Sequence, residues 1–277
     1  MIKTIQTPSL SRVGPGNRST LELVVGPTYY GLIFNISAAA GLDVTDIGRI
    51  DVLMNGRVVQ TYKNLQRLMD INAFYNRVAD TVGATAIEFG LHFFRGEMAD
   101  SVYKRLPGIG TQDLGTFHIE MDIAAAAPAD IAIKAHAIIN PIAEPLGAFV
   151  NIREYPTSFS TSGEQEIDKL PKGDWYTAIH LFKSDISKVE VVTDNGSGPV
   201  KVVEATKAVL ERYQKNASPI KRVPVTASCT HVDFTALDGN LQDTLPTAGL
   251  RDFRIKPTLT TSGAVDVVAE TYSTLAA

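Results

Sequence analysis

The sequence predicts an all-β chain that folds as two tandem eight-stranded jelly rolls, a double jelly roll, with short helices in the loops. Three observations lead to this fold class. Apolar segments are short, alternate with polar residues, and end at Gly, Pro, Asn or Asp turns, which is typical of strands in a sandwich. Few helical patterns interrupt them, whereas a parallel α/β fold needs a helix after nearly every strand. Several blocks also recur half a chain length apart, and two copies are too few for a solenoid or propeller.

The recurring blocks include DIGRIDV, residues 46–52, which matches DISKVEV, residues 185–191, in residue class at every position. Their separation, 185 − 46 = 139 residues, is half the length of the 277-residue chain. Upstream of them, YYGLIF (29–34) and WYTAIHLF (175–182) both combine aromatic and aliphatic residues, which favours strands. The chain therefore states one structural pattern twice.

Both copies continue as a turn, a second strand and a helix. Asn55 and Gly56 lie between two apolar runs and predict a tight hairpin, because both residues tolerate a positive φ. The corresponding turn in the second copy is longer, from Asp194 to Pro199. Asn64 is placed to cap the first helix. The expected apolar helix faces carry Leu65, Leu68 and Met69 in the first copy, and Ala205, Ala208, Val209 and Tyr213 in the second.

A second pair of blocks lies near the end of each half. GTFHIEMDI (115–123) corresponds to RDFRIKPTL (251–259), so that Phe117 matches Phe253, and a further strand-like run follows each block. Four blocks in one order indicate two copies of a β-rich domain. We expect an N-terminal roll over residues 1–140 and a C-terminal roll over 141–277. The proline-containing stretch INPIAEPLGA is the expected joint.

Composition excludes several classes of protein. The net charge is −4, and Arg12 and Arg18 are too few to form a basic arm, so direct nucleic-acid binding is not expected. The first residues lack the apolar core of a signal peptide. The most apolar later window, IAIKAHAIINPIAEPLGAFV, is interrupted by charges and prolines and does not predict a membrane span. We expect a soluble protein or a member of a soluble assembly.

Motifs for catalysis are absent. The sequence has no phosphate-binding loop, no G-x-S-x-G elbow and no cysteine pair for zinc. The single cysteine, Cys229, is expected to be a small core residue. A nucleophilic Cys229 would need a partner, and only His231, on the same strand face, is available. We therefore expect no catalytic and no cofactor-binding residues, and we leave metal ligands unassigned.

Two groups of polar residues could nevertheless form sites. His118, Glu120 and Asp122 share one face of a strand and could hold a divalent cation, although a solvated or interface face of an edge strand is the favoured interpretation. The carboxylates Glu164, Glu166 and Asp168 are expected in a loop rather than as an acid/base pair. The five histidines all fall in strand-like runs and include no H-x-H motif of cupin metal enzymes: His92, His118, His136, His180 and His231.

Trp175 is the only tryptophan. We expect it to be a core aromatic residue at the start of a strand. Sugar-binding modules usually display several aromatic platforms. A tandem carbohydrate-binding protein and a cupin-like metal enzyme remain the two alternatives to a structural role.

Three stretches carry a family resemblance: SLSRVGPGNRSTLELVVGPTY (9–29), VLMNGRVVQTYKNLQRLMDIN (52–72) and EIDKLPKGDWYTAIHLFKSDISKVEVVTD (166–194). FHIEMDIAAAAP (117–128) is a weaker fourth. With these blocks the chain resembles the double jelly-roll major capsid proteins of tailless, membrane-containing double-stranded DNA bacteriophages, and among them the corticovirus coat proteins. Residues 80–115 and the last forty match less well.

The resemblance implies a non-enzymatic major capsid protein in the shell of an icosahedral virion with an internal membrane, assembled in the host bacterial cytoplasm. It implies homotrimers that form pseudo-hexameric capsomers, because two similar rolls let one chain fill two of six quasi-equivalent places. The implied partners are other copies of the chain, a vertex (penton) protein, and the viral membrane or its proteins. No nucleic acid contact and no required cofactor are implied. Structural calcium is compatible with the resemblance, and no motif places its ligands.

Overall fold

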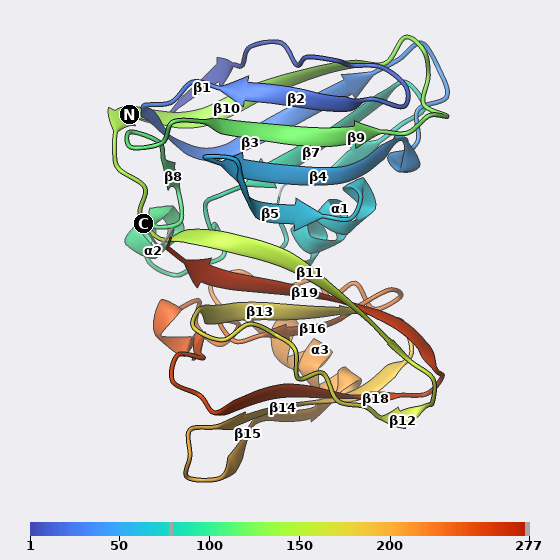
Figure 1. The fold of residues 1–277 in the computed structure, drawn as a ribbon, viewed down its shortest axis with the longest axis vertical. Coiled ribbons are helices and arrows are strands. Elements are labelled where there is room, and N and C mark those ends of the chain that lie inside the picture. Colours follow the sequence, from blue (N-terminus) through green and yellow to red (C-terminus); the bar gives the residue numbers. More distant parts are fainter. Residues whose placement is uncertain (78–79, 275–277) are drawn as a thin grey trace. The chain divides into compact units, whose positions relative to one another are not determined.

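A computed structural model describes residues 1–77 and 80–274 and confirms the all-β class, with three short α-helices in the described chain (Figure 1). The chain forms two compact units. The first comprises residues 1–96 and 101–152 with Thr274, and the second comprises residues 97–100 and 153–273. The predicted domain boundary between residues 140 and 141 falls inside a strand and remains a prediction. The predicted end of the second roll, residues 275–277, lies outside the described residues.

The first unit contains two sheets, with strand orders β1-β10-β3-β7-β6 and β5-β4-β9-β2. A short strand, β8, pairs with β3. The sheets pack face to face, since the ring of Tyr29 on β3 meets that of Phe117 on β9 edge-on at 5.2 Å. The elements are β1 (Lys3–Gln6), β2 (Arg18–Leu23), β3 (Pro27–Ser37), η1 (Val44–Asp46), β4 (Ile47–Met54), β5 (Arg57–Tyr62), α1 (Leu65–Phe74), β6 (Thr81–Val82), β7 (Ala86–His92), α2 (Ser101–Arg105), β8 (Ile109–Gly110), β9 (Phe117–Ile123) and β10 (Ala132–Ala143).

Strand β11 (Phe149–Phe159) begins in the first unit and continues into the second. The second unit contains the strand orders β16-β13-β19, with β17 on β13, and β12-β18-β14-β15. Tyr176 on β13 meets Phe253 on β18 edge-on at 4.9 Å within the apolar core. The remaining elements are β12 (Gly163–Glu164), β13 (Trp175–Phe182), β14 (Ile186–Asp194), β15 (Pro199–Thr206), α3 (Lys207–Lys215), β16 (Thr230–Asp233), η2 (Leu241–Asp243), β17 (Leu245–Pro246), β18 (Asp252–Leu259) and β19 (Gly263–Ser273).

The internal repeat is confirmed at the level of strand pairing. β3 lies between β10 and β7 in the first unit, as β13 lies between β19 and β16 in the second. The order β9-β4-β5 likewise matches β18-β14-β15. The register agrees as well: Met54 pairs with Phe117, and Thr193, 139 residues after Met54, pairs with Phe253. The repeated sequence blocks therefore mark equivalent strands.

Side-chain contacts repeat together with the strands. Tyr29 donates a hydrogen bond from its hydroxyl to the carbonyl of Val24 at 2.7 Å. Tyr176 does the same to the carbonyl of Pro171, again five residues upstream, at 2.6 Å. Each tyrosine also packs against the phenylalanine that the sequence blocks match, Phe117 or Phe253. A buried hydroxyl needs a partner, so the tyrosine fixes the chain that enters each roll.

The predicted hairpin and the first helix are confirmed. Asn55 and Gly56 have φ values of 49° and 74° and join β4 to β5. The side chain of Asn64 accepts a hydrogen bond from the backbone amide of Arg67 at 2.9 Å, which satisfies a free donor at the start of α1. The expected apolar face of α1 is buried. None of the described helices is long and apolar enough to cross a membrane.

The predicted face of the second helix is wrong. Ala205 lies in β15, before α3 begins, and Val209 and Tyr213 are 57% and 42% exposed. Instead Leu210 joins the core, and the buried Gln214 donates to the carbonyl of His231 at 2.7 Å. The sequence pattern missed this because a polar residue, held by a backbone hydrogen bond, occupies the inward face.

Candidate functional site

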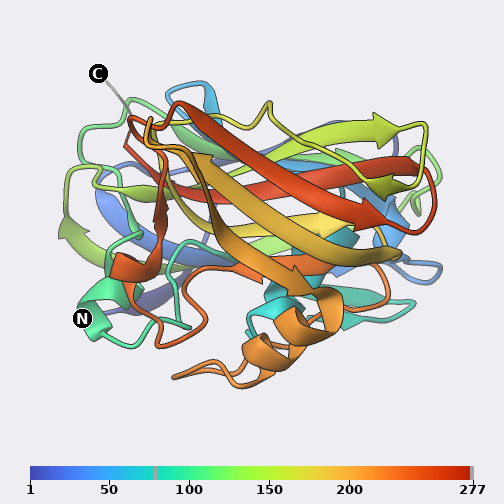
Figure 2. The same cartoon turned by 90° about the horizontal axis from the view of Figure 1, so that it is seen from below.

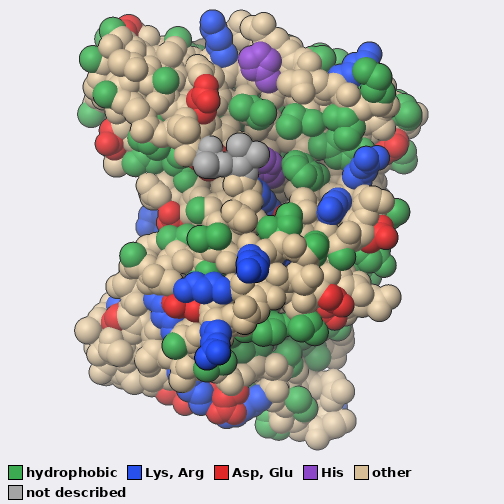
Figure 3. Space-filling view, turned by 180° about the vertical axis from the view of Figure 1, so that it is seen from behind, with side chains coloured by type: hydrophobic (Ala, Val, Ile, Leu, Met, Phe, Trp, Pro, Cys, Tyr) green, Lys and Arg blue, Asp and Glu red, His purple; other side chains and the backbone are tan. Residues whose placement is uncertain are grey.

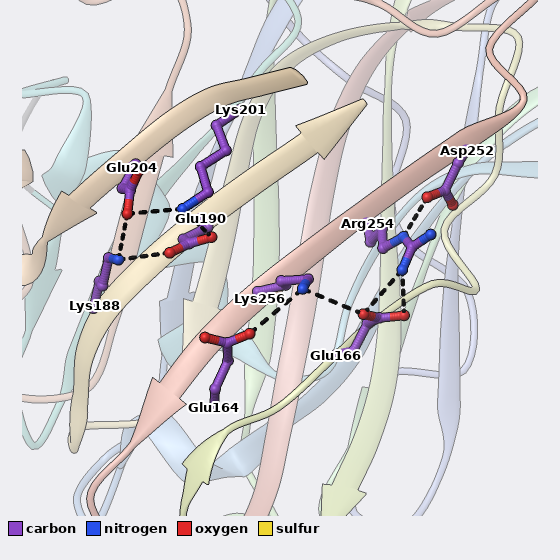
Figure 4. Close-up of polar contacts among 9 residues, drawn as sticks. All are labelled: Glu164, Glu166, Lys188, Glu190, Lys201, Glu204, Asp252, Arg254 and Lys256. Atoms are coloured by element: carbon purple, nitrogen blue, oxygen red, sulfur yellow. Dashed lines mark hydrogen bonds and ion pairs between the residues drawn. The ribbon is translucent and has the colours of Figure 1, made fainter. Parts of the chain in front are cut away.

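The outer face of the sheet β12-β18-β14-β15 carries an ordered set of charges (Figure 4). We call it the charged face of the second unit. It consists of Glu164, Glu166, Lys188, Glu190, Lys201, Glu204, Asp252, Arg254 and Lys256. Side chains on one face of a sheet alternate along each strand, so neighbouring strands bring these groups into ion-pair distance.

Four of these residues form a closed ring across β14 and β15. Lys188 lies 2.5 Å from Glu190 and 2.6 Å from Glu204. Lys201 lies 3.0 Å from Glu190 and 2.9 Å from Glu204. The two glutamates are direct cross-strand partners and would repel each other. The two lysines each bridge both carboxylates and remove that repulsion.

The remaining members of the charged face lie on β18 and the chain beside it. Arg254 forms ion pairs with Asp252 and, at 3.1 Å, with Glu166. Lys256 lies 3.4 Å from Glu164 and 3.7 Å from Glu166. Exposed pairs of this kind contribute little stability each, about 0–1 kcal/mol. Their main consequence is that the face offers nearly balanced charge to whatever it contacts.

Ion pairing shifts the protonation of the ring. Hydrogen bonds from Lys188 and then Lys201 lower the pKa of Glu204 to about 2 and also lower the pKa of Glu190. The same carboxylates raise the pKa of both lysines. All four groups therefore remain charged from neutral pH well into the acidic range.

The first unit places charges at equivalent positions but pairs them differently. Arg18 on β2 lies 2.5 Å from Asp51, 2.7 Å from Glu120 and 2.7 Å from Asp122. Arg49 lies 2.9 Å from Asp51. Although partial burial alone would lower the pKa of Arg18, hydrogen bonds to these three carboxylates raise it. Asp51 and Glu190 occupy matching places, since both lie on the middle strand at the 139-residue offset.

This geometry corrects the interpretation of the row His118, Glu120 and Asp122. The row lies on β9 as predicted, but β9 is not an edge strand, because β4 and β2 pair on its two sides. The carboxylates of Glu120 and Asp122 are bound by the guanidinium of Arg18. β2 and β9 are about 100 residues apart in the sequence but pair in the sheet. The alternation of residues within one strand cannot show this pairing.

Histidine and cysteine positions agree with the strand pattern. All five histidines lie in strands. Cys229 is buried, as expected, with its Sγ 3.7 Å from Nδ1 of His231. That nitrogen lies 2.7 Å from Nδ1 of His180, whose Nε2 is 3.1 Å from Glu270. Burial lowers the pKa of His231 well below its usual value. A thiol that is 1% exposed is out of reach of a substrate.

Within the described residues, no group of three or more His, Cys, Asp or Glu side chains is arranged to hold a metal ion. The metal ligands therefore stay unassigned. A pocket of about 410 Å³ in the second unit is lined by Glu154–Thr157 and Glu166–Leu170. Its lining has no histidine or cysteine, and its Glu166 is already bound by Arg254.

Two expectations about exposed residues need correction. Trp175 does start a strand, but it is 56% exposed, and the next residue, Tyr176, takes the core position. Glu164 lies in the short strand β12 rather than in a loop. Glu166 and Asp168 lie outside the strands, as expected, on either side of Ile167, which bridges to Ile255 on β18. Single bridges of this kind leave no alternating pattern to detect.

Sequence reasoning also missed the residues that organise the charges, Arg18, Lys188 and Lys201. A signal existed in two short runs, ISKVEV and VKVVE, where charges recur on strands that otherwise carry valine. Lys188 and Glu190 in the first run lie at alternate strand positions, which indicates a solvated sheet face. Lys201 and Glu204 in the second run are three residues apart and hide this pattern, because a bulge interrupts the pairing of β15 with β14.

Family models match both halves of the chain. The model described as the N-terminal domain of viral coat protein P2 matches residues 4–140, and that of the C-terminal domain matches residues 149–275. Major capsid protein P2 of Pseudoalteromonas phage PM2 is 28% identical over 273 residues, which are 95% of this chain and 93% of that protein.

Solved structures give the same result. The crystal structure of P2 from bacteriophage PM2 superposes with a TM-score of 0.85 at 25% identity, and the match covers 100% of this chain and 98% of that chain. A chain from the atomic structure of Sulfolobus turreted icosahedral virus has a TM-score of 0.71 at 9% identity, covering 98% and 90% of the two chains. The latter shows likeness of fold alone. Together they confirm the predicted double jelly roll.

Proposed function

Because the chain belongs to the viral coat protein P2 family, we propose that it is the major capsid protein of an icosahedral bacteriophage with an internal membrane. In this proposal three copies form a homotrimer, and the six rolls of the trimer give a pseudo-hexameric capsomer that tiles the shell. The role is structural rather than enzymatic.

The internal repeat is the main observation that supports the proposed trimer. Each unit pairs its strands in the same order, with Met54 on Phe117 in one and Thr193 on Phe253 in the other. Two equivalent rolls in one chain can occupy two neighbouring places of six, so threefold symmetry yields a near-sixfold outline. A single roll per chain would need six copies to do the same.

Surface charge supports the proposed partners. Acidic and basic side chains are interspersed on the face drawn in Figure 3, and the net charge is −4. A surface of this kind does not favour binding to nucleic acid, which attracts a basic excess. We propose that the shell meets a membrane or its proteins on one side and a vertex protein at its corners. Assembly would take place in the cytoplasm of the bacterial host.

The proposed role requires no cofactor. Structural calcium remains a proposal without assigned ligands. It is tested by adding EDTA or calcium chloride to the purified protein and comparing the native mass and the melting temperature. A calcium-dependent rise in either would support a structural ion, and identical values would count against it.

The native mass of the purified chain, measured by light scattering after size exclusion, tests the trimer. One chain has a mass of 29.9 kDa, so a trimer is expected near ~90 kDa. Electron microscopy of concentrated trimer should then show hexagonal arrays. A monomer near ~30 kDa at every concentration would reject the capsomer. Glycan binding would then be measured, because a tandem carbohydrate-binding protein is one of the two alternatives to a structural role.

A further inference from the structure

The two units differ at one sheet edge. β5 and β15 are equivalent strands, since each pairs with the middle strand, β4 or β14, and each has a bulge at the same place, after Val52 or Val191. The outer side of β5 is covered at Gln60. Ile152 at the start of β11 pairs in parallel with Gln60, whose side-chain amide donates to the carbonyl of Val150 at 2.8 Å.

β15 has no such cover. Within residues 1–77 and 80–274, β14 is the only strand that pairs with it. Val200 and Val202 are 60% and 43% exposed. β15 forms the edge of its sheet and leads directly into α3 (Figure 2). A long edge strand with exposed β-branched residues is a template for another strand.

The charges on β15 do not protect this edge. Lysine on an edge strand usually deters pairing with another chain. Here Lys201 and Glu204 are both bound to the ring of ion pairs on their own sheet. The unpaired backbone of β15 and its valines are therefore free to accept a strand.

The repeat also identifies the strand that fits. In strand order β11 stands next to β19, and β1 stands next to β10, the equivalent of β19. β1 is thus the counterpart of β11, the strand that covers β5. All four residues of β1 are exposed, including Ile5 at 41%, and Ile2 just before it is 46% exposed. β1 is the outer strand of its sheet and pairs only with β10 among the described strands.

We propose that β1 of a second copy pairs with β15, in the parallel sense in which β11 pairs with β5. The contact joins Ile5 of one copy to Val202 of the next and, in the same register, Lys3 to Val200. It is a head-to-tail contact, which closes into a ring when three copies are related by threefold rotation. The inference rests on the proposed function and names the contact between the copies of the trimer.

Engineered disulfides test the pairing directly. Adjacent strands lie about 4.8 Å apart, within the range that a disulfide spans. The double variants Ile5→Cys with Val202→Cys, and Lys3→Cys with Val200→Cys, share one register and are oxidised as the full-length protein. Covalent dimers and trimers are expected on a non-reducing gel and should disappear on reduction. The native Cys229 is buried and should not contribute.

The matched control combines Val82→Cys with Val202→Cys. Val82 is 53% exposed and lies on β6, at the opposite edge of the sheet that contains β1. This pair should give no covalent multimer. In addition, Val202→Glu should weaken self-association at least about ten-fold, while Val82→Glu should leave it unchanged.

The native mass distinguishes failure of the β1–β15 contact from failure of the trimer itself. A trimer in which neither test pair cross-links, or in which the control pair cross-links equally well, overturns the β1–β15 contact and leaves the capsomer standing. A monomer at every concentration overturns both. Cross-linking of a test pair alone, in a protein of trimer mass, establishes the contact.

Discussion

Replacing Phe253 with alanine tests whether the repeated aromatic pair stabilises the second roll. Phe253 is 2% exposed, and its ring packs edge-on against Tyr176 at 4.9 Å. Removing a buried phenylalanine side chain costs about 3–5 kcal/mol, which combines the lost transfer free energy with the cavity that remains. The ring pair accounts for about 0.5–1.5 kcal/mol of this. Phe253→Leu, which keeps most of the volume, should cost about 1.5 kcal/mol or less.

Urea unfolding, followed by tryptophan fluorescence, suits this measurement. Trp175 is the only tryptophan and lies next to Tyr176, so its emission reports on the second roll. Protein concentration is held constant, because self-association adds to apparent stability. Phe117→Ala, the equivalent change in the first unit, should cost a similar free energy when circular dichroism follows the whole chain. A loss below about 1 kcal/mol for Phe253→Ala would refute the view that this pair is a core contact.

Three further changes give distinct outcomes. Asn64→Ala should lower the free energy of unfolding by about 1 kcal/mol, because the cap of α1 is lost, and Asn64→Ser should restore most of it in the same urea assay. Arg18→Ala should cost about 1–3 kcal/mol at pH 7, since it leaves the buried Asp51 with Arg49 alone, whereas Arg12→Ala on the nearby surface should cost less than about 0.5 kcal/mol. The pKa of Asp185 is lowered to about 2: partial burial opposes this, and hydrogen bonds from Thr261 and Lys183 outweigh it. The stabilisation from ionised Asp185 should thus be fully present above about pH 4 and lost as the pH falls through about 2. The melting temperatures of Asp185→Asn and of the parent protein should therefore differ most near pH 5 and converge near pH 2.

The repeat made much of the fold predictable. Equivalent strands had to keep their alternation and their turn residues, so the blocks around Asp46 and Asp185 located the middle strands of both units. Asn55 and Asn64 were readable because a left-handed turn and a helix cap each depend on one local residue type. Local rules of this kind need no knowledge of distant parts of the chain.

Features that depend on contacts between distant parts of the chain could not be predicted from the sequence. Arg18 binds carboxylates on β9 that lie about a hundred positions later, and nothing near it in the sequence indicates that partner. The face of α3 was misjudged because Gln214, a polar residue, is buried through a hydrogen bond to His231. Trp175 was assigned to the core as an aromatic residue at the start of a strand. β13 is buried on both faces only from Tyr176 onward, so Trp175 stays exposed at its end.

The two units share their core packing and differ at one sheet edge. This difference bears on how one chain could fill two places in a shell. The aromatic pairs and the strand registers coincide, so each roll can be stable by the same packing. The equivalent carboxylates Asp51 and Glu190 are both neutralised, one by Arg18 from β2 and the other by lysines of β14 and β15. The edges differ: Ile152 covers β5 at Gln60 within the same chain, while β15 is longer and pairs with β14 alone among the described strands. If three copies close into a ring through the β1–β15 contact, both equivalent edge strands become covered. β5 is then covered by β11 of its own chain, and β15 by β1 of the neighbouring chain. The two units then differ at edges and turns because these parts contact different neighbours. The cores contact only residues of their own roll, so the same packing serves in both units.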